Sequence, residues 1–265
     1  GQYYHNDVFD AHFEYRRSYG GGTDVYKHAA ERVGNVENPY KSFNYFEIGG
    51  TYHIRDYDIN KPSKVFLFNK EISRDTWAAT NTQKIMIPAL LRQVIGGRLG
   101  GVFYNSMSDL NDVSRSQGFT LSNGNGDALP TDVAAFANVQ TVSLYVGGSF
   151  TWIRNFAVEF QDGNEPTGDD LILTTYLDVM FAPSINIDDV IYMGDTYSTD
   201  VVSTNNIGFR LGVEGKFDRI MSWSYGAEIG VRPGVAKRGF FLMGRLSFPV
   251  FGTNFQSNYQ PTRFY

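Results

Sequence analysis

The sequence predicts an all-β chain that folds as a transmembrane, antiparallel, up-and-down β-barrel. The first observation is alternation: over residues 139–152, side chains such as Leu144 and Val146 alternate with Ser143 and Tyr145, and residues 239–250 repeat the pattern. Such a period of two over ten or more residues is typical of an extended strand with one apolar and one polar face. The second observation is length, since a tilted strand needs roughly 9–11 residues to cross a bilayer. The third is composition, because aromatic residues make up 15% of the chain.

Eight segments carry this alternation, and two weaker ones extend the series. We expect the eight strands at 43–56, 92–105, 139–152, 155–161, 170–182, 206–216, 222–232 and 239–250. The weaker candidates are 8–16 and 185–193. A tight turn is expected near Arg154 and Asn155, and a second at Pro233 and Gly234, since Pro-Gly is a strong turn signal. We therefore expect 8–10 strands.

The polar connections favour ten strands over eight. Segments 106–137, 162–169 and 194–205 are rich in turn formers, and barrels place their long loops on the extracellular side. With ten strands all three connections become extracellular, whereas residues 57–91 become a long periplasmic segment. Within that segment, residues 84–92 could form a short helix or continue a strand. We expect residues 1–265 to be one domain.

Composition excludes several classes of function. The net charge of −5 with no basic stripe argues against a nucleic-acid partner. The chain has no cysteine, so it has no disulfide, thiolate metal site or cysteine nucleophile. No signal peptide is visible, but Gly1 and Gln2, followed directly by an aromatic polar segment, resemble a mature end left by signal-peptide cleavage.

The polar residues at alternate positions of the strands predict a charged interior. Both signs occur there in similar number, and a barrel of about eight strands is just wide enough for side chains to fill. We expect these charges to pair, because an unpaired buried charge is costly. The expected structural network in the barrel lumen comprises Glu47, His53, Arg55, Arg98, Glu159, Asp178, Arg210, Glu214, Glu228 and Arg245. The alternative is a narrow polar path for a small solute.

Alternation alone does not say which face points inward. In a soluble β-sandwich or a lipocalin-like barrel, the apolar face would line the interior. Two features favour the opposite arrangement: the polar face holds small residues with charges of both signs, and large aromatics lie toward segment ends, as in interfacial girdles. Those aromatics are Phe43, Tyr45, Phe103, Phe150, Trp152, Trp223, Tyr225, Phe240 and Phe248.

No catalytic, cofactor or metal site is predicted. The chain has only four histidines, and no serine elbow or phosphate loop is present. His53 is the single histidine embedded in a strong strand candidate, and we expect it to hydrogen-bond a carboxylate rather than to serve an outer-membrane hydrolase. Acid pairs such as Asp169-Asp170 and Asp188-Asp189 do not form a calcium-loop series, so we expect them to be solvated.

An aromatic tail follows the last strand over residues 251–265. A tail this aromatic is unusual for a solvated segment, so docking on a partner is a second interpretation beside a disordered tail. The candidate docking residues are Phe251, Phe255, Tyr259, Phe264 and Tyr265.

The segment Gly239–Val250 resembles the closing strand of small outer-membrane β-barrel proteins of Bacteroidota, and residues 141–160 and 206–232 are similar in style. The long aromatic tail departs from their usual layout. The resemblance implies an integral protein of the Gram-negative outer membrane, in contact with lipid and lipopolysaccharide. It also implies a non-catalytic subunit of a larger envelope assembly for secretion, uptake or outer-membrane biogenesis, with other outer-membrane or periplasmic proteins as partners. A narrow channel, or less favourably a hydrolase, is the alternative.

Overall fold

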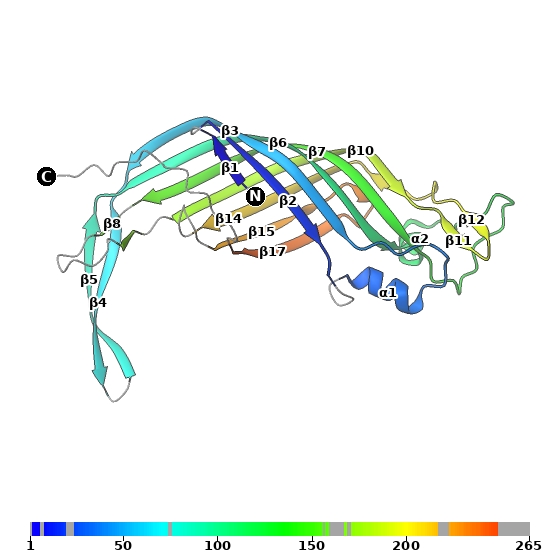
Figure 1. Cartoon of the computed structure of the whole chain (residues 1–265), viewed down its shortest axis with the longest axis horizontal. Coiled ribbons are helices and arrows are strands. Elements are labelled where there is room, and N and C mark those ends of the chain that lie inside the picture. Colours follow the sequence, from blue (N-terminus) through cyan, green and yellow to red (C-terminus); the bar gives the residue numbers. More distant parts are fainter. Residues whose placement is uncertain are drawn as a thin grey trace.

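The computed structural model describes residues 2–5, 8–19, 24–73, 76–155, 157–158, 167–168, 171–216 and 223–248. These residues form mostly antiparallel β-sheet, as expected for an all-β chain. The main sheet has nine strands in the order β1-β2-β3-β6-β7-β10-β14-β15-β17. Its long strands follow one another along the chain, as an up-and-down arrangement requires, and the sheet curls into a half-barrel (Figure 1).

Eight strands of the main sheet are long and one is short. The long strands are β2 (Phe9–Arg17), β3 (Asn44–Asn60), β6 (Leu90–Asp109), β7 (Phe136–Asn155), β10 (Leu171–Ile187), β14 (Ile207–Lys216), β15 (Ser224–Val231) and β17 (Phe240–Ser247). The short strand, β1 (Gln2–His5), pairs with the first residues of β2. The weaker candidate at 8–16 is therefore a full member of the sheet.

Within the described residues, two expected segments do not form separate crossing strands of the main sheet. Of residues 155–161, Ala157–Val158 (β8) pair with Thr167–Gly168 (β9), and Asn155 ends β7 rather than forming a tight turn. The segment 185–193 is divided between the end of β10 and the short β11 (Val190–Tyr192), which pairs with β12 (Asp195–Tyr197). The described sheet thus has eight long strands and not ten.

The described connections lie at the two ends of the sheet. Segments 110–135 and 188–206 meet at one end of the sheet, as expected. Of the expected connection 162–169, only residues 167–168 are described, so its predicted placement lies outside the described residues. β7 ends and β10 begins at the opposite end of the sheet. The hairpin of β4 (Ser63–Ser73) and β5 (Thr76–Ile87) projects from that same opposite end (Figure 1). Residues 84–87 end β5 and residues 90–92 begin β6, with Pro88 and Ala89 between the two strands. The stretch is therefore strand on both sides of a break, and it is not a helix.

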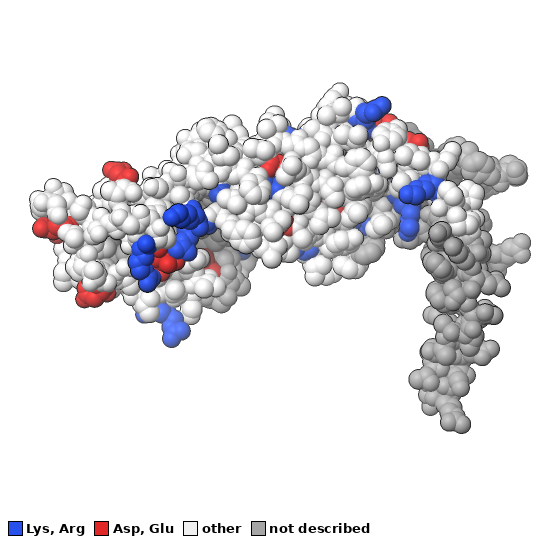
Figure 2. Space-filling view, turned by 180° about the vertical axis from the view of Figure 1, so that it is seen from behind, with Lys and Arg blue, Asp and Glu red and all other residues white. Residues whose placement is uncertain are grey.

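The apolar side chains at alternate positions of the strands face outward. Leu144 and Val146 are 57% and 61% exposed, whereas the intervening Tyr145 is 1% exposed. Lys, Arg, Asp and Glu gather toward both ends of the visible face, and the middle is mostly other residues (Figure 2). This arrangement is the reverse of a lipocalin-like barrel, in which the apolar face lines the interior.

Among the expected girdle residues, Trp223, Phe240 and Phe248 are exposed. Tyr45 is not, because it shares the parity of Glu47 and is buried on the inner, concave face.

Within the part of the chain that the structure describes, no helix is long and apolar enough to cross a membrane. The two helices, α1 (Val25–Val33) and α2 (Leu110–Gln117), are short and lie at one end of the sheet (Figure 1). The Asp24 and Asp109 side chains cap their first turns by accepting backbone N–H bonds. We call α1, α2 and residues 34–43, 118–135, 188–206 and 232–239 the cap.

Candidate functional site

A buried ion-paired network fills the inner face of the sheet. Arg210 on β14 lies at its centre: its Nε is 2.8 Å from Asp178 Oδ2, and its terminal nitrogens lie 2.5 and 2.8 Å from the two Glu47 oxygens. Arg98 on β6 donates to the other Asp178 oxygen at 2.9 Å. Four of the expected residues therefore meet in one cluster, which we call the central network.

Tyrosine side chains complete the central network. The Tyr45 hydroxyl donates to Glu47, the Tyr145 hydroxyl lies 2.9 Å from His12 Nε2, and that nitrogen lies 3.1 Å from Glu47. The Arg98 guanidinium stacks over Tyr176 with 4.1 Å to the ring centroid, and Arg210 stacks over Tyr145 at 4.7 Å. Such stacking contributes about 0.5–1 kcal/mol at exposed sites and about 2 kcal/mol when it is desolvated.

Glycines in neighbouring strands make room for these rings. Gly100 pairs directly with Tyr145, and a Cβ at Gly100 would lie 2.5 Å from the Tyr145 hydroxyl. Gly212 pairs with Tyr176, and a Cβ there would lie 2.1 Å from the ring. Glycine inside these strands is thus required by the close approach of an aromatic ring rather than by backbone angles.

A second group of charges lies where the first and last long strands approach each other. Arg245 on β17 is 3.2 Å from Glu14 Oε2 on β2 and 3.2 Å from Glu214 Oε1 on β14. Arg16 on β2 binds Glu14 at 2.6 Å and reaches Glu228 at 3.5 Å. Glu228 also accepts a hydrogen bond from Tyr176 at 2.7 Å. The expected residues Glu214, Glu228 and Arg245 therefore form this second group, which we call the seam network.

Two further expected residues lie apart from both networks. His53 Nε2 is 3.0 Å from Asp10 Oδ2, which agrees with a histidine bonded to a carboxylate. Arg55 is exposed instead of facing inward, so its assignment to the network is wrong. The pairing of β3 with β6 shifts between His53 and Arg55, and this bulge reverses the faces of the residues that follow.

Other expected residues lie outside the described residues. These are Glu159 and the tail residues Phe251, Phe255, Tyr259, Phe264 and Tyr265. Four network members from β2 and β7 were not among the expected residues, namely His12, Glu14, Arg16 and Tyr145. The sequence pattern of β2 indicates inward-facing polar residues, because Asp10, His12, Glu14 and Arg16 alternate with apolar residues along this strand.

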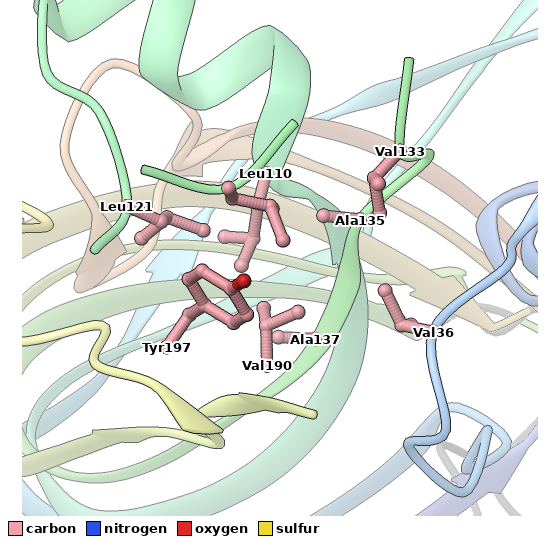
Figure 3. Packing of buried hydrophobic residues seen from close by; sticks show 9 residues of the cluster. Val36, Leu110, Leu121, Val133, Ala135, Ala137, Val190 and Tyr197 are labelled. Atoms are coloured by element: carbon pink, nitrogen blue, oxygen red, sulfur yellow. The ribbon is translucent and has the colours of Figure 1, made fainter. Parts of the chain in front are cut away.

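The cap has its own hydrophobic core. Residues far apart in sequence pack there, from Val36 through Leu110 to Val190 and Tyr197 (Figure 3). Asn138 links this core to the neighbouring loops, because its amide lies 2.9 Å from Asp188 and its side-chain oxygen accepts from Lys41. The cap is therefore a packed layer and not a set of separate loops.

Burial in the cap also affects Tyr40, which packs against this core. Removal of its hydroxyl from water raises the pKa of the Tyr40 phenol. The phenol therefore stays neutral and introduces no charge into the cap core at physiological pH.

The described residues contain no cluster of three or more His, Cys, Asp or Glu that could hold a metal ion. The acidic inner-face residues are instead engaged by arginine. No protein-family model matches the chain, and no match was found among curated proteins or solved structures.

Proposed function

We propose that the chain is an integral outer-membrane β-barrel protein without catalytic activity, which serves as a structural and partner-binding subunit of a larger cell-envelope assembly. The observation that carries this proposal is the separation of the two faces. Large apolar side chains are exposed around the outside, while charged groups such as Asp178 and Arg210 are fully buried inside. Soluble monomers rarely expose contiguous apolar patches larger than a few hundred Å². A bilayer would cover this surface.

Closure of the barrel between β2 and β17 is part of the proposal. The contacts Glu14–Arg245 and Arg16–Met243 support it, because a step of two residues forward on β2 matches a step of two residues back on β17. That is the pattern of antiparallel neighbours. β1 covers the edge of β2 only from Phe9 to His12, so the rest of that edge can accept β17.

The filled interior favours a role outside the lumen. Arg210 and Glu47 bridge strands on opposite sides of the interior, and the tyrosines occupy the space beside them. Passage of a solute would require these buried pairs to separate, which is costly. The packed cap and the aromatic tail are therefore the surfaces that we assign to partner proteins, and the outer face is assigned to lipid.

Lipid contact can be tested with single-cysteine labels, since the chain has no native cysteine. We expect a fluorophore on Leu144→Cys to be quenched by phosphatidylcholine with brominated acyl chains. The same fluorophore on Val201→Cys is the matched control, because Val201 is also exposed but lies in the cap. Equal quenching at both positions, or none at Leu144, would exclude the proposed orientation in the membrane.

The two remaining functional alternatives have distinct readouts. A stable unitary conductance of the purified protein in planar bilayers would favour a narrow channel over the filled lumen. A hydrolase activity that is lost in His53→Ala would favour an enzyme. For the partner-binding role, co-purifying proteins should be released when residues 252–265 are deleted or when the cap is altered. If neither change releases any partner, the subunit role is overturned.

A further inference from the structure

A pocket of about 160 Å³ lies at the cap end of the inner face. Ser106 and Ser108 line it from β6, and Arg232 and Arg238 line it from the connection between β15 and β17. The remaining lining is glycine, valine or aromatic, and none of the described residues that line the pocket is Asp or Glu. Arg238 is paired with Asp112 of α2. Arg232 is therefore the arginine of this lining whose positive charge has no carboxylate partner among the described residues.

Arg232 differs from the other inner-face arginines. Arg16, Arg98, Arg210 and Arg245 each bind at least one carboxylate. In the described part of the chain, Arg232 has no carboxylate within salt-bridge distance.

Arg232 stacks on aromatic rings instead. Its guanidinium carbon lies 4.0 Å from the centroid of the Phe241 ring and 5.2 Å from that of Tyr45. Ring stacking engages the faces of the guanidinium, whereas its five N–H donors lie in the plane. These donors are therefore available to a ligand in the pocket.

The connection that carries Arg232 is held in place before any ligand arrives. The Arg232 backbone N–H donates to Gly239 O at 2.8 Å, and the Tyr104 hydroxyl donates to the Pro233 carbonyl. Gly234 has φ of 153°, and a Cβ there would lie 2.8 Å from the Tyr104 hydroxyl. A fixed donor set loses little entropy when it binds, which favours affinity.

We propose that this pocket binds a small tetrahedral oxyanion, namely a phosphate group. The guanidinium of Arg232 matches two phosphate oxygens, and the Ser106 and Ser108 hydroxyls add neutral donors. The volume suits a group of a few heavy atoms, since pockets for drug-sized ligands run to roughly 300–1,000 Å³. The site does not depend on the proposed partner-binding role.

Two sources could supply the phosphate. One is free inorganic phosphate. The other is a lipid headgroup, because Phe240 also lines the pocket and its side chain is 69% exposed. The chemistry at Arg232 is the same for both sources, and the experiment separates them.

The test uses the full chain in detergent micelles, titrated with sodium phosphate at constant ionic strength by calorimetry. We expect binding by the native chain and at least about tenfold weaker binding by Arg232→Gln, because the variant loses charge-assisted hydrogen bonds to the phosphate. Arg232→Lys keeps the charge and should restore part of the affinity. The matched control is Arg115→Gln, because Arg115 is an exposed cap arginine that does not line this pocket.

A parallel arm uses nanodiscs of phosphatidylcholine with 10 mol% phosphatidic acid, and native mass spectrometry then counts retained phosphatidic acid. Retention that falls in Arg232→Gln but not in Arg115→Gln, without binding of free phosphate, assigns the pocket to a lipid headgroup. Binding of free phosphate with the same variant pattern assigns it to the soluble anion. If neither phosphate source binds, or if Arg232→Gln binds both as the native chain does, the proposal is overturned.

Discussion

Arg210 and Glu47 form a two-point ion pair across the interior of the sheet, although β14 and β3 are separated in the strand order by β6, β7 and β10. Adjacent strands are about 4.8 Å apart, so a flat sheet would hold these two strands roughly 19 Å apart. Their direct contact therefore measures how strongly the sheet curls. It also shows that the interior at this level is occupied by side chains.

The first prediction concerns the stability that this pair provides. Arg210→Ala should lower the free energy of unfolding in detergent by about 3–5 kcal/mol, because Glu47 and Asp178 would remain buried without their main counter-charge. Denaturant unfolding followed by tryptophan fluorescence measures the change. Arg115→Ala is the control, since Arg115 is exposed and should shift stability by less than about 0.5 kcal/mol. Equal effects of the two substitutions would contradict a stabilising role for the central network.

The second prediction compares two adjacent glycines in β6. Gly100→Ala should destabilise the protein by about 1–3 kcal/mol, because the new Cβ would press against the Tyr145 hydroxyl and the Ile48 carbonyl. Gly101→Ala faces outward, and its nearest neighbours would lie at 3.7 and 3.8 Å, which is ordinary contact. It should be neutral or slightly stabilising, since alanine restricts the unfolded chain.

The same unfolding measurement distinguishes crowding from a general loss of strand stability. If Gly101→Ala is as harmful as Gly100→Ala, crowding by the tyrosine is not the cause. Tyr145→Phe provides a second check, since removal of the hydroxyl should relieve part of the Gly100→Ala defect.

Alternation in the sequence predicted most of the strands, because successive side chains of an extended strand point to opposite faces of the sheet. It could not predict the bulge at residues 53–55, which depends on the partner strand and places Arg55 outside. Nor could alternation show that Asn155 ends β7, or that Ala157 and Val158 pair with Thr167 and Gly168. These pairings depend on which strand lies alongside, and Asn155 pairs with Leu90 of β6.

The cap was the least predictable part of the molecule. Its core combines Val36, Leu110 and Val190 from three connections that show no common period. Such long-range packing leaves no local signal in the sequence. The polar network was more accessible, because charges on the inward parity of several strands must find partners, although the sequence did not determine which partners meet.

The third prediction tests closure between β2 and β17. If Glu14 faces Arg245 and Arg16 faces Met243, then Tyr15 should lie opposite Gly244. The double variant Tyr15→Cys with Gly244→Cys should form a disulfide on mild oxidation, because directly paired strand residues have Cα atoms within the 4.4–6.8 Å that a disulfide allows. Electrophoresis after denaturation, with and without reductant, detects the cross-link.

The control for closure moves one partner by two residues on the same face. Tyr15→Cys with Leu246→Cys should cross-link much more slowly, since diagonal neighbours lie beyond ideal disulfide geometry. Similar cross-linking of both pairs would mean that the seam has no fixed register. Failure of the Tyr15–Gly244 pair alone would exclude the proposed register.

The fourth prediction concerns the cap as a unit that can loosen while the sheet stays folded. Leu110→Ala removes a fully buried side chain from the cap core and should destabilise it by about 2–5 kcal/mol. Local opening would then expose the α2 backbone beside Arg115, so limited trypsin digestion should cleave there faster than in the native chain. Met193→Ala is the matched control, since Met193 lies in the cap at 80% exposure and should leave the cleavage rate unchanged. The sheet should resist heating equally in the native chain, Leu110→Ala and Met193→Ala, because the central and seam networks do not involve Leu110. The gel mobility of each protein after heating measures this resistance. If Leu110→Ala unfolds sheet and cap together, the cap is instead a cooperative part of the β-structure.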